Sequence, residues 1–255
     1  MALSSFAGGR LWGARQGTGR PWVLALPGWG RDHNDFASAL AGLDAVALDL
    51  PGFGAVPEPP APWSTAEYAE AVVAVLDDLC ERAVVVGHSF GGRVAVRLAS
   101  DRRVAALVLT GAPLAPPPGR ALPRPPLAYR AGRMLHRAGL VGSDRMERLR
   151  QKYGSDDYRC AGEVMRGVLV KAVKETSEGA YIPALRAFVE AGGALELVWG
   201  EHDRVASLAG VTAGLQGLAG GAVRTTVVQG AGHLLSSQLA QALRDAVLRQ
   251  WVPTA

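Results

Sequence analysis

The stretch that decides the fold is Ala83-Val84-Val85-Val86-Gly87-His88-Ser89-Phe90-Gly91-Gly92. Its first four residues are apolar and mostly β-branched, which predicts a strand in the middle of a sheet because neither face of the strand is polar. The strand stops at Gly87, and a helical pattern runs from about 91 to 99. Ser89 therefore lies in a G-x-S-x-G pattern on a sharp turn from strand to helix, where a nucleophilic hydroxyl is exposed. Glycines flank it because side chains there would collide with neighbouring elements.

Short apolar runs alternate with helical patterns on both sides of this turn. Further strands are expected at 22–26, 45–48, 104–109, 195–199 and 223–228, and further helices at 34–41, 64–79, 205–218 and 234–251. This alternation predicts βαβ units and a mostly parallel sheet.

The alternation is interrupted between residues 114 and 193. Six prolines between 116 and 126 forbid regular structure there, and helical, Arg-rich patterns follow until 194. We therefore expect an α/β core formed by residues 1–113 and 194–255, with a helical cap at 114–193 inserted into it.

The positive charge of the chain belongs to this insertion. The 255 residues carry a formal charge of +4, but fourteen basic and only eight acidic residues lie between 114 and 192, so the rest of the chain is slightly acidic. So small an overall excess does not indicate nucleic acid as a partner.

Several other classes of protein are also disfavoured. Cys80 and Cys160 lie in no Cys/His cluster, so we expect reduced thiols, no metal and no cofactor. The first residues do not resemble a secretory signal, and no apolar run approaches the roughly 18 residues of a membrane span. These features favour a cytoplasmic protein with no membrane partner.

A serine nucleophile needs a base within hydrogen-bond reach and an acid that orients the base. His233 follows the last expected strand in a Gly-rich loop, and Asp203 follows the strand before it. Both therefore lie at the carboxyl edge of the sheet, where Ser89 also emerges. Glu201 competes with Asp203 for the role of the acid.

Acyl transfer also needs donors for the oxyanion. The main-chain N–H of Phe90, directly after the serine, is the first candidate. The N–H of Trp29 is the second, in the loop after the strand at 22–26, where Gly28 lets the backbone approach a substrate.

Five segments together resemble the α/β-hydrolase fold superfamily over nearly the whole chain; they lie at 27–30, 49–54, 87–92, 199–203 and 230–233. The resemblance implies an eight-stranded, mostly parallel sheet flanked by helices, with a cap after the sixth strand. It also implies a triad of Ser89, Asp203 and His233, in the chain order that favours Asp203 over Glu201. Where the family loop usually carries His-Gly, this chain has Pro27-Gly28, so one polar contact is lost.

The expected activity is that of a serine hydrolase that cleaves a small carboxylic ester or thioester through an acyl-enzyme on Ser89. Hydrolysis of a carbon-carbon bond, lyase-type chemistry and lactone opening on the same triad remain alternatives, as does a non-catalytic binding protein of this fold. The sequence leaves the oligomeric state open.

The basic cap suggests how a substrate is selected. We expect one or two of its arginines to face the cleft and bind a carboxylate or phosphate of the substrate, and His33 to line the entrance. The candidate arginines are Arg130, Arg133, Arg137 and Arg159.

Overall fold

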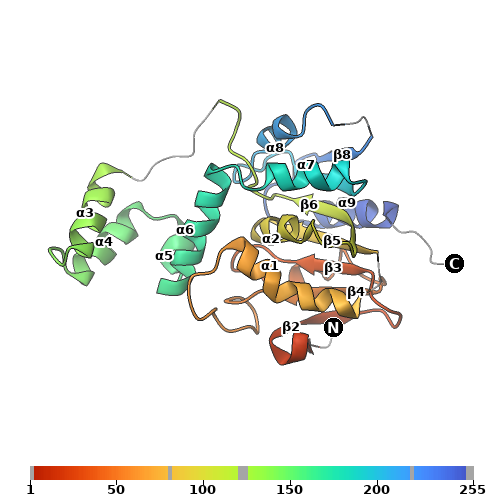
Figure 1. Ribbon diagram of the computed structural model, residues 1–255, viewed down its shortest axis with the longest axis horizontal. Coiled ribbons are helices and arrows are strands. Elements are labelled where there is room, and N and C mark those ends of the chain that lie inside the picture. Colours follow the sequence, from red (N-terminus) through yellow and green to blue (C-terminus); the bar gives the residue numbers. More distant parts are fainter. Residues whose placement is uncertain (1–2, 80–81, 120–125, 219–220, 251–255) are drawn as a thin grey trace.

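The computed structural model describes residues 3–79, 82–119, 126–218 and 221–250, and within them the chain forms one eight-stranded sheet (Figure 1). The strands are β1 (Leu3–Phe6), β2 (Leu11–Gln16), β3 (Val23–Leu26), β4 (Ala45–Asp49), β5 (Ala83–His88), β6 (Val104–Thr110), β7 (Ala194–Gly200) and β8 (Val223–Val228). Their order across the sheet is β1-β2-β4-β3-β5-β6-β7-β8. Neighbouring strands from β4 to β8 are parallel, whereas the pairs β1–β2 and β2–β4 are antiparallel. The expected fold class is confirmed.

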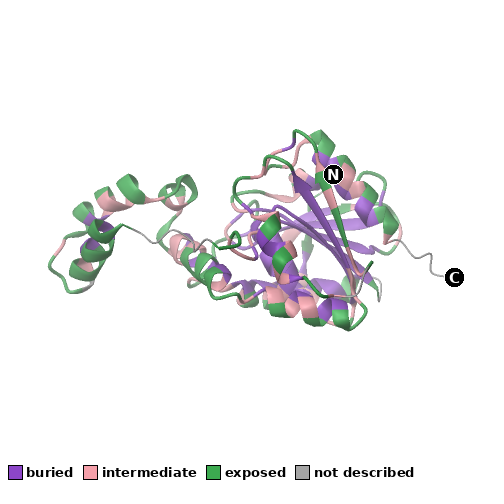
Figure 2. Ribbon diagram, turned by 90° about the horizontal axis from the view of Figure 1, so that it is seen from above, coloured by how far each residue is buried: buried purple, intermediate pink, exposed green. Residues whose placement is uncertain are grey.

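Helices cover both faces of the sheet, and Figure 2 shows the buried strands between them. The helices of the core are α1 (Thr65–Val73), α2 (Phe90–Leu98), α7 (Ile182–Glu190), α8 (Leu208–Gly214) and α9 (Ser237–Arg249). Side chains alternate across each strand. Leu24 and Leu26 pack in the apolar cluster with α1, α2 and α7, whereas Val23 and Ala25 pack in the cluster with α9.

Two local expectations are corrected by the structure. Strands β1 and β2, which complete the expected eight, were not located from the sequence, because the glycines at 8, 9 and 13 break any apolar pattern at the N-terminal edge. The helix expected at 34–41 is only a 3₁₀ turn, His33–Phe36, followed by turns that bury Leu40. By contrast, the predicted start of α1 has the expected capping box, in which Ser64 and Glu67 each accept from the other's backbone N–H.

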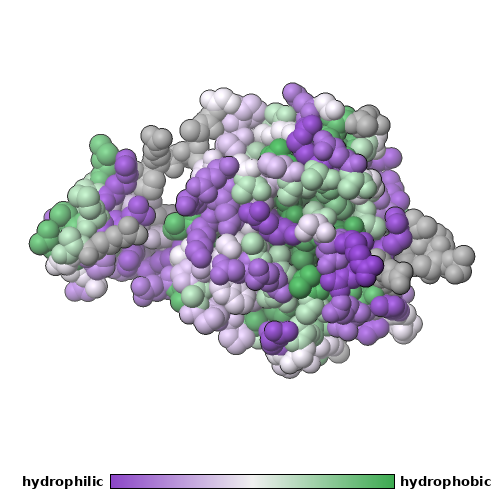
Figure 3. Space-filling model, in the orientation of Figure 1, coloured by the Kyte–Doolittle hydropathy of each residue, from purple (hydrophilic) through white to green (hydrophobic). Residues whose placement is uncertain are grey.

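The insertion after β6 contributes four helices within the described residues, namely α3 (Leu127–Arg137), α4 (Ser143–Tyr153), α5 (Asp156–Cys160) and α6 (Glu163–Ser177). Helices α3 and α4 pack on each other and stand away from the body (Figure 1). Figure 3 shows hydrophobic surface on this pair, where Leu127, Met134 and Leu140 are exposed. Helix α6 lies against the core through Met165, Val168 and Ala172. Helix α7 packs on α2 and β7, so the end of the 114–193 segment joins the sheet.

The sheet also fixes where a site can form. Strand order reverses between β3 and β5, because the chain moves outward from β3 to β4 and then returns to the other side. Loops at the carboxyl ends of two such strands diverge and leave a crevice. The turn after β5 carries Ser89, and the loop after β3 carries Trp29.

No helix of the described residues is long and apolar enough to cross a bilayer. Cys160 is a free, exposed thiol, and Cys80 lies outside the described residues.

Candidate active site

Ser89 occupies a strained turn between β5 and α2. Its backbone has φ 50° and ψ −110°, a conformation that L-residues rarely adopt. Its N–H donates to the carbonyl of Thr110 on the neighbouring strand, at 3.0 Å. The turn projects the Ser89 side chain out of the sheet edge, where it lines a cavity.

The glycines around Ser89 make room for this turn, as expected from the sequence. A Cβ on Gly87 would lie 2.5 Å from the Cα of Gly92. A Cβ on Gly91 would lie 2.1 Å from the carbonyl oxygen of Leu26. Both contacts are with backbone, which cannot move aside, so the G-x-S-x-G pattern is a packing requirement of the β3, β5 and α2 junction.

Three side chains from three loops form one hydrogen-bonded chain. The Nε2 of His233 lies 3.0 Å from the Oγ of Ser89, and its Nδ1 lies 2.9 Å from the Oδ2 of Asp203. The structure thus brings together the three residues expected from the sequence. Glu201, the competitor for the acid, instead accepts from the N–H of Gly230.

Asp203 is held by more than His233. Its Oδ1 accepts from the N–H groups of Val205 and Ala206 at 2.8 and 3.0 Å, and its side chain is 1% exposed. Burial raises the pKa of Asp203, but the hydrogen bonds from His233, Ala206 and Val205 outweigh it and leave the pKa below its usual value. Asp203 is therefore a buried anion next to the imidazole of His233.

His88 also belongs to the site, and the only signal for it in the sequence is its place beside Ser89. Its Nε2 lies 3.0 Å from the carbonyl oxygen of His233, and the two ring centroids are 5.2 Å apart. Burial lowers the pKa of His88 to about 4. The ring is therefore neutral at physiological pH, and the contact requires that Nε2 carry its proton and donate to His233.

The two expected oxyanion donors lie beside Ser89. Among the described residues, neither the N–H of Trp29 nor that of Phe90 donates to another protein group, and both residues line the cavity with Ser89. A Cβ on Gly28 would lie 2.8 Å from the Nδ1 of His88, so this position requires glycine. The carbonyl of Pro27 accepts from the N–H of Gly91 at 2.9 Å, which ties the loop to α2 without the usual histidine.

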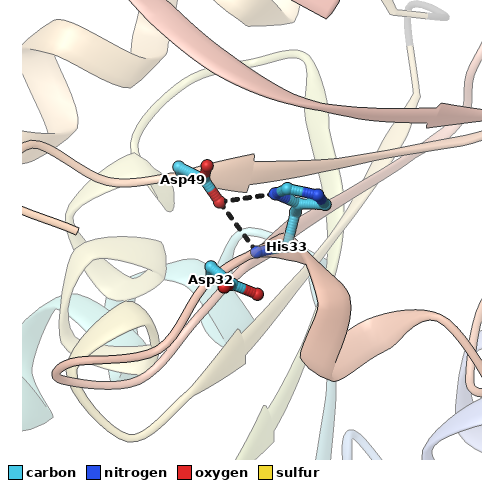
Figure 4. A group of neighbouring side chains, drawn as sticks. All are labelled: Asp32, His33 and Asp49. Atoms are coloured by element: carbon cyan, nitrogen blue, oxygen red, sulfur yellow. Dashed lines mark hydrogen bonds and ion pairs between the residues drawn. The ribbon is translucent and has the colours of Figure 1, made fainter. Parts of the chain in front are cut away.

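His33 does not line the entrance as expected. Figure 4 shows it against Asp49, whose Oδ1 accepts from the N–H of His33 at 2.8 Å and lies 2.7 Å from its Nδ1. The other oxygen of Asp49 accepts from the N–H of Ala55, and Asp32 caps the N–H of Asn34. Asp32, His33 and Asp49 are near enough to one another to bind a metal ion. Their hydrogen bonds to each other and to the backbone, however, already account for their positions, because they hold the loop that carries Trp29 in place.

A cavity of about 450 Å³ opens beside Ser89 and is closed on one side by α5 and α6. Its apolar wall includes Trp29, Leu169, Val173 and Val205. Its arginines are Arg93 and Arg204, both outside the cap.

The arginines predicted to face the cleft do not line this cavity. Arg130 and Arg133 are exposed on α3, which stands away from the body, and Arg159 pairs with Asp156 one turn earlier in the chain. The side chain of Arg137 lies outside the described part of the structure. That expectation was wrong for the three described residues, because sequence patterning does not reveal how far α3 lies from the sheet edge.

Comparison with known proteins agrees with this architecture. A profile described as the alpha/beta hydrolase family matches residues 23–246. The lipase LipV of Mycobacterium tuberculosis is 45% identical over 83 residues, which are 31% of this chain and 31% of the lipase. The dihydrolipoyllysine-residue acetyltransferase component of the acetoin cleaving system of Cupriavidus necator is 43% identical over 93 residues, 34% of this chain and 25% of that protein.

Among solved structures, a thermophilic esterase from Thermogutta terrifontis superposes with a TM-score of 0.63 at 19% identity, covering 98% of this chain and 97% of the esterase. That likeness shows the fold alone. The two curated matches span only 25% and 31% of those relatives. The family profile, however, extends from β3 into α9 and so includes the Ser89 turn and the loops of Asp203 and His233. The chain belongs to the alpha/beta hydrolase family.

Proposed function

We propose that the protein is a serine hydrolase that cleaves a carboxylic ester or thioester of a small molecule through an acyl-enzyme on Ser89. The observation that carries the proposal is the unbroken chain of contacts from Asp203 through His233 to Ser89, at 2.9 and 3.0 Å. A nucleophile, a base and an orienting acid in this arrangement are the parts that acyl transfer requires.

The first half-reaction follows from the positions of these atoms. Ser89 Oγ attacks the scissile carbonyl while His233 Nε2 takes its proton, and the buried carboxylate of Asp203 stabilises the imidazolium. The N–H groups of Trp29 and Phe90 receive the oxyanion. His233 then returns the proton to the departing alcohol or thiol, which leaves an acyl-enzyme.

Water completes the cycle. It gives a proton to His233 and attacks the acyl carbonyl, after which the proton returns to Ser89 and the carboxylic acid departs. A lactone is an internal ester, so the same steps would open its ring. Cleavage of a carbon-carbon bond would instead use His233 mainly for proton transfer to carbon, and a binding protein would use none of these steps.

Active-site labelling tests the proposal directly. We expect a fluorophosphonate probe to modify Ser89, as read by peptide mass spectrometry, and a panel of p-nitrophenyl esters to give a burst of one product per site. Ser89→Ala should abolish labelling and turnover, while Ser100→Ala, at an exposed serine on the same protein, should retain both. Turnover that survives in Ser89→Ala would favour carbon-carbon bond chemistry, and absence of labelling in the folded wild type would favour a binding role.

A further inference from the structure

Arg93 is a buried cation in the wall of the candidate active-site cavity. It lies on α2, and the residue is only 7% exposed. Its Nε donates to the carbonyl of Pro113 at 3.3 Å, and its Nη2 donates to the hydroxyl of Thr176 at 3.2 Å. The Thr176 hydroxyl in turn donates to Pro113 at 2.7 Å. The guanidinium is thus fixed in place by neutral groups.

No carboxylate among the described residues pairs with Arg93. Two other arginines of the core do have such partners: Arg97, one turn further along α2, pairs with Glu175, and Arg249 pairs with Glu196. A buried charge is costly unless it is paired, and burial lowers the pKa of Arg93, although Tyr181 and the Glu175 carboxylate act in the opposite direction from beyond ion-pair distance. Two of its five N–H groups are used, so both N–H groups of Nη1 and one of Nη2 remain to bind a partner.

The position of Arg93 relative to Ser89 sets the reach of such a partner. The N–H of Arg93 donates to the carbonyl of Ser89 at 3.4 Å, so the two residues lie across the first turn of α2. Both line the same cavity. One small substrate could therefore place its scissile carbonyl at Ser89 and a second polar group at Arg93, with a short chain between the two.

We propose that Arg93 is the recognition residue for a carboxylate on the substrate, placed a short aliphatic chain away from the scissile carbonyl. This inference rests on the proposed function and names its substrate class: half-esters of short dicarboxylic acids and their thioester equivalents. The planar fork of a guanidinium matches a carboxylate in two parallel hydrogen bonds.

The rest of the cavity fits a singly charged, partly apolar molecule. Leu169 and Val173 of α6 supply an apolar wall for the chain, and exposed Arg204 adds a second positive charge at the rim. Asp157 of α5 and Asp203 also line the cavity, so its walls carry two carboxylates besides the two arginines, which disfavours a doubly charged phosphate.

Binding to a protein that cannot turn over separates this inference from the proposed function. The probes are monomethyl glutarate and methyl glutaramate, which have the same length and shape but differ in a terminal carboxylate or amide. In the Ser89→Ala protein, isothermal titration calorimetry should give a Kd at least tenfold lower for the acid than for the amide. Monomethyl succinate and adipate then show whether one chain length is preferred.

Matched variants assign the effect to Arg93. In the Ser89→Ala background, Arg93→Gln should bring the two Kd values to within about twofold, and Arg93→Lys should keep part of the difference because it keeps the charge but not the fork. Arg97→Gln, on the same helix but paired outside the cavity, should keep the full difference. Circular dichroism and melting curves show which variants are folded.

Two results would overturn the inference: equal binding of acid and amide by the Ser89→Ala protein, or a difference that survives in folded Arg93→Gln. The first needs no arginine variant, so it stands even if Arg93→Gln does not fold. Because binding is measured without turnover, a carboxylate preference can be found or refuted whether or not Ser89 is a nucleophile. Fluorophosphonate labelling of Ser89 tests the proposed function separately, and its result does not depend on the binding measurements.

Discussion

The Nε2 of His88 lies 3.0 Å from the main-chain carbonyl oxygen of His233. A neutral histidine buried behind the nucleophile thus holds the backbone of the residue whose ring contacts Ser89 and Asp203. His88 touches none of the reacting atoms in the proposed mechanism, so it is a positioning residue.

Removing this contact should slow turnover without weakening substrate binding. We expect His88→Phe to lower kcat about tenfold with little change in KM, since one hydrogen bond to a neutral acceptor contributes about 0.5–1.5 kcal/mol. His88→Gln, whose amide N–H can donate, should recover part of the rate. His202→Ala is the control, because that side chain is 65% exposed and lies beside Asp203 in sequence without contacting it. Equal losses in His88→Phe and His88→Gln would contradict a positioning role.

His88 should also make stability depend on pH. Its pKa is about 4 in the folded protein and about 6.5 in the unfolded chain, so the unfolded state takes up a proton first as the pH falls. The stability that neutral His88 contributes is therefore fully present above pH 6.5 and is lost progressively as the pH falls to 4. At pH 5 this protonation lowers the unfolding free energy by about 2 kcal/mol. Urea denaturation at pH 7.5 and pH 5 measures this loss. The loss of unfolding free energy between the two pH values should be about 2 kcal/mol smaller in His88→Gln than in the wild type. An identical loss in both proteins would show that His88 is not the group responsible.

The backbone of Ser89 should store strain that glycine releases. At φ 50° and ψ −110°, a Cβ is unfavourable, whereas glycine adopts the conformation freely. We expect Ser89→Gly to unfold with a free energy about 1 kcal/mol higher than Ser89→Ala, because both lack the hydroxyl and only one lacks the Cβ. Chemical denaturation of the two variants gives the comparison. A Ser89→Ala protein at least as stable as Ser89→Gly would show that the turn is relaxed.

Gly91 should not tolerate even one methyl group. Its Cβ would lie 2.1 Å from the carbonyl of Leu26, at the start of the loop that carries Trp29. Gly91→Ala should therefore lower the unfolding free energy by about 3 kcal/mol or more and reduce the rate of fluorophosphonate labelling, since β3 and α2 must separate. Gly142→Ala, where nothing lies within 4 Å of the new Cβ, should leave the labelling rate unchanged and lower the unfolding free energy by no more than about 1 kcal/mol, the cost of alanine at the N-cap of α4. Normal labelling of Gly91→Ala would show that the junction can relax.

The sequence predicted those parts of the site that depend on local pattern. Ser89, Asp203 and His233 each follow a run rich in apolar or β-branched residues with a glycine close behind it, so their strands, and hence their common edge, could be inferred before their contacts were known. The positions of the edge strands β1 and β2 could not, because the serines of β1 and Gly13 of β2 leave no apolar run, and the strands are defined by their pairing with each other and of β2 with distant β4.

The arginines show the limit of the same reasoning. Counting charges located the basic segment and led us to expect the recognition residue there, whereas the buried arginine of the cavity, Arg93, lies in the core on the almost fully buried helix α2. Arg93 differs from Arg97 and Arg249 because no carboxylate among the described residues pairs with it. Its partner Thr176 lies 83 residues away in the chain, so the contact cannot be predicted from the local sequence pattern.

The two oxygens of Asp203 have separate tasks: Oδ1 is held by the backbone of Val205 and Ala206, and Oδ2 faces His233. A carboxylate fixed in this way cannot rotate when positive charge develops on the imidazole. No rotation is needed, because Oδ2 already lies 2.9 Å from the Nδ1 of His233. In the proposed mechanism the electrostatic rearrangement around His233 is completed during folding, so that each catalytic cycle begins from surroundings already suited to the charged intermediate.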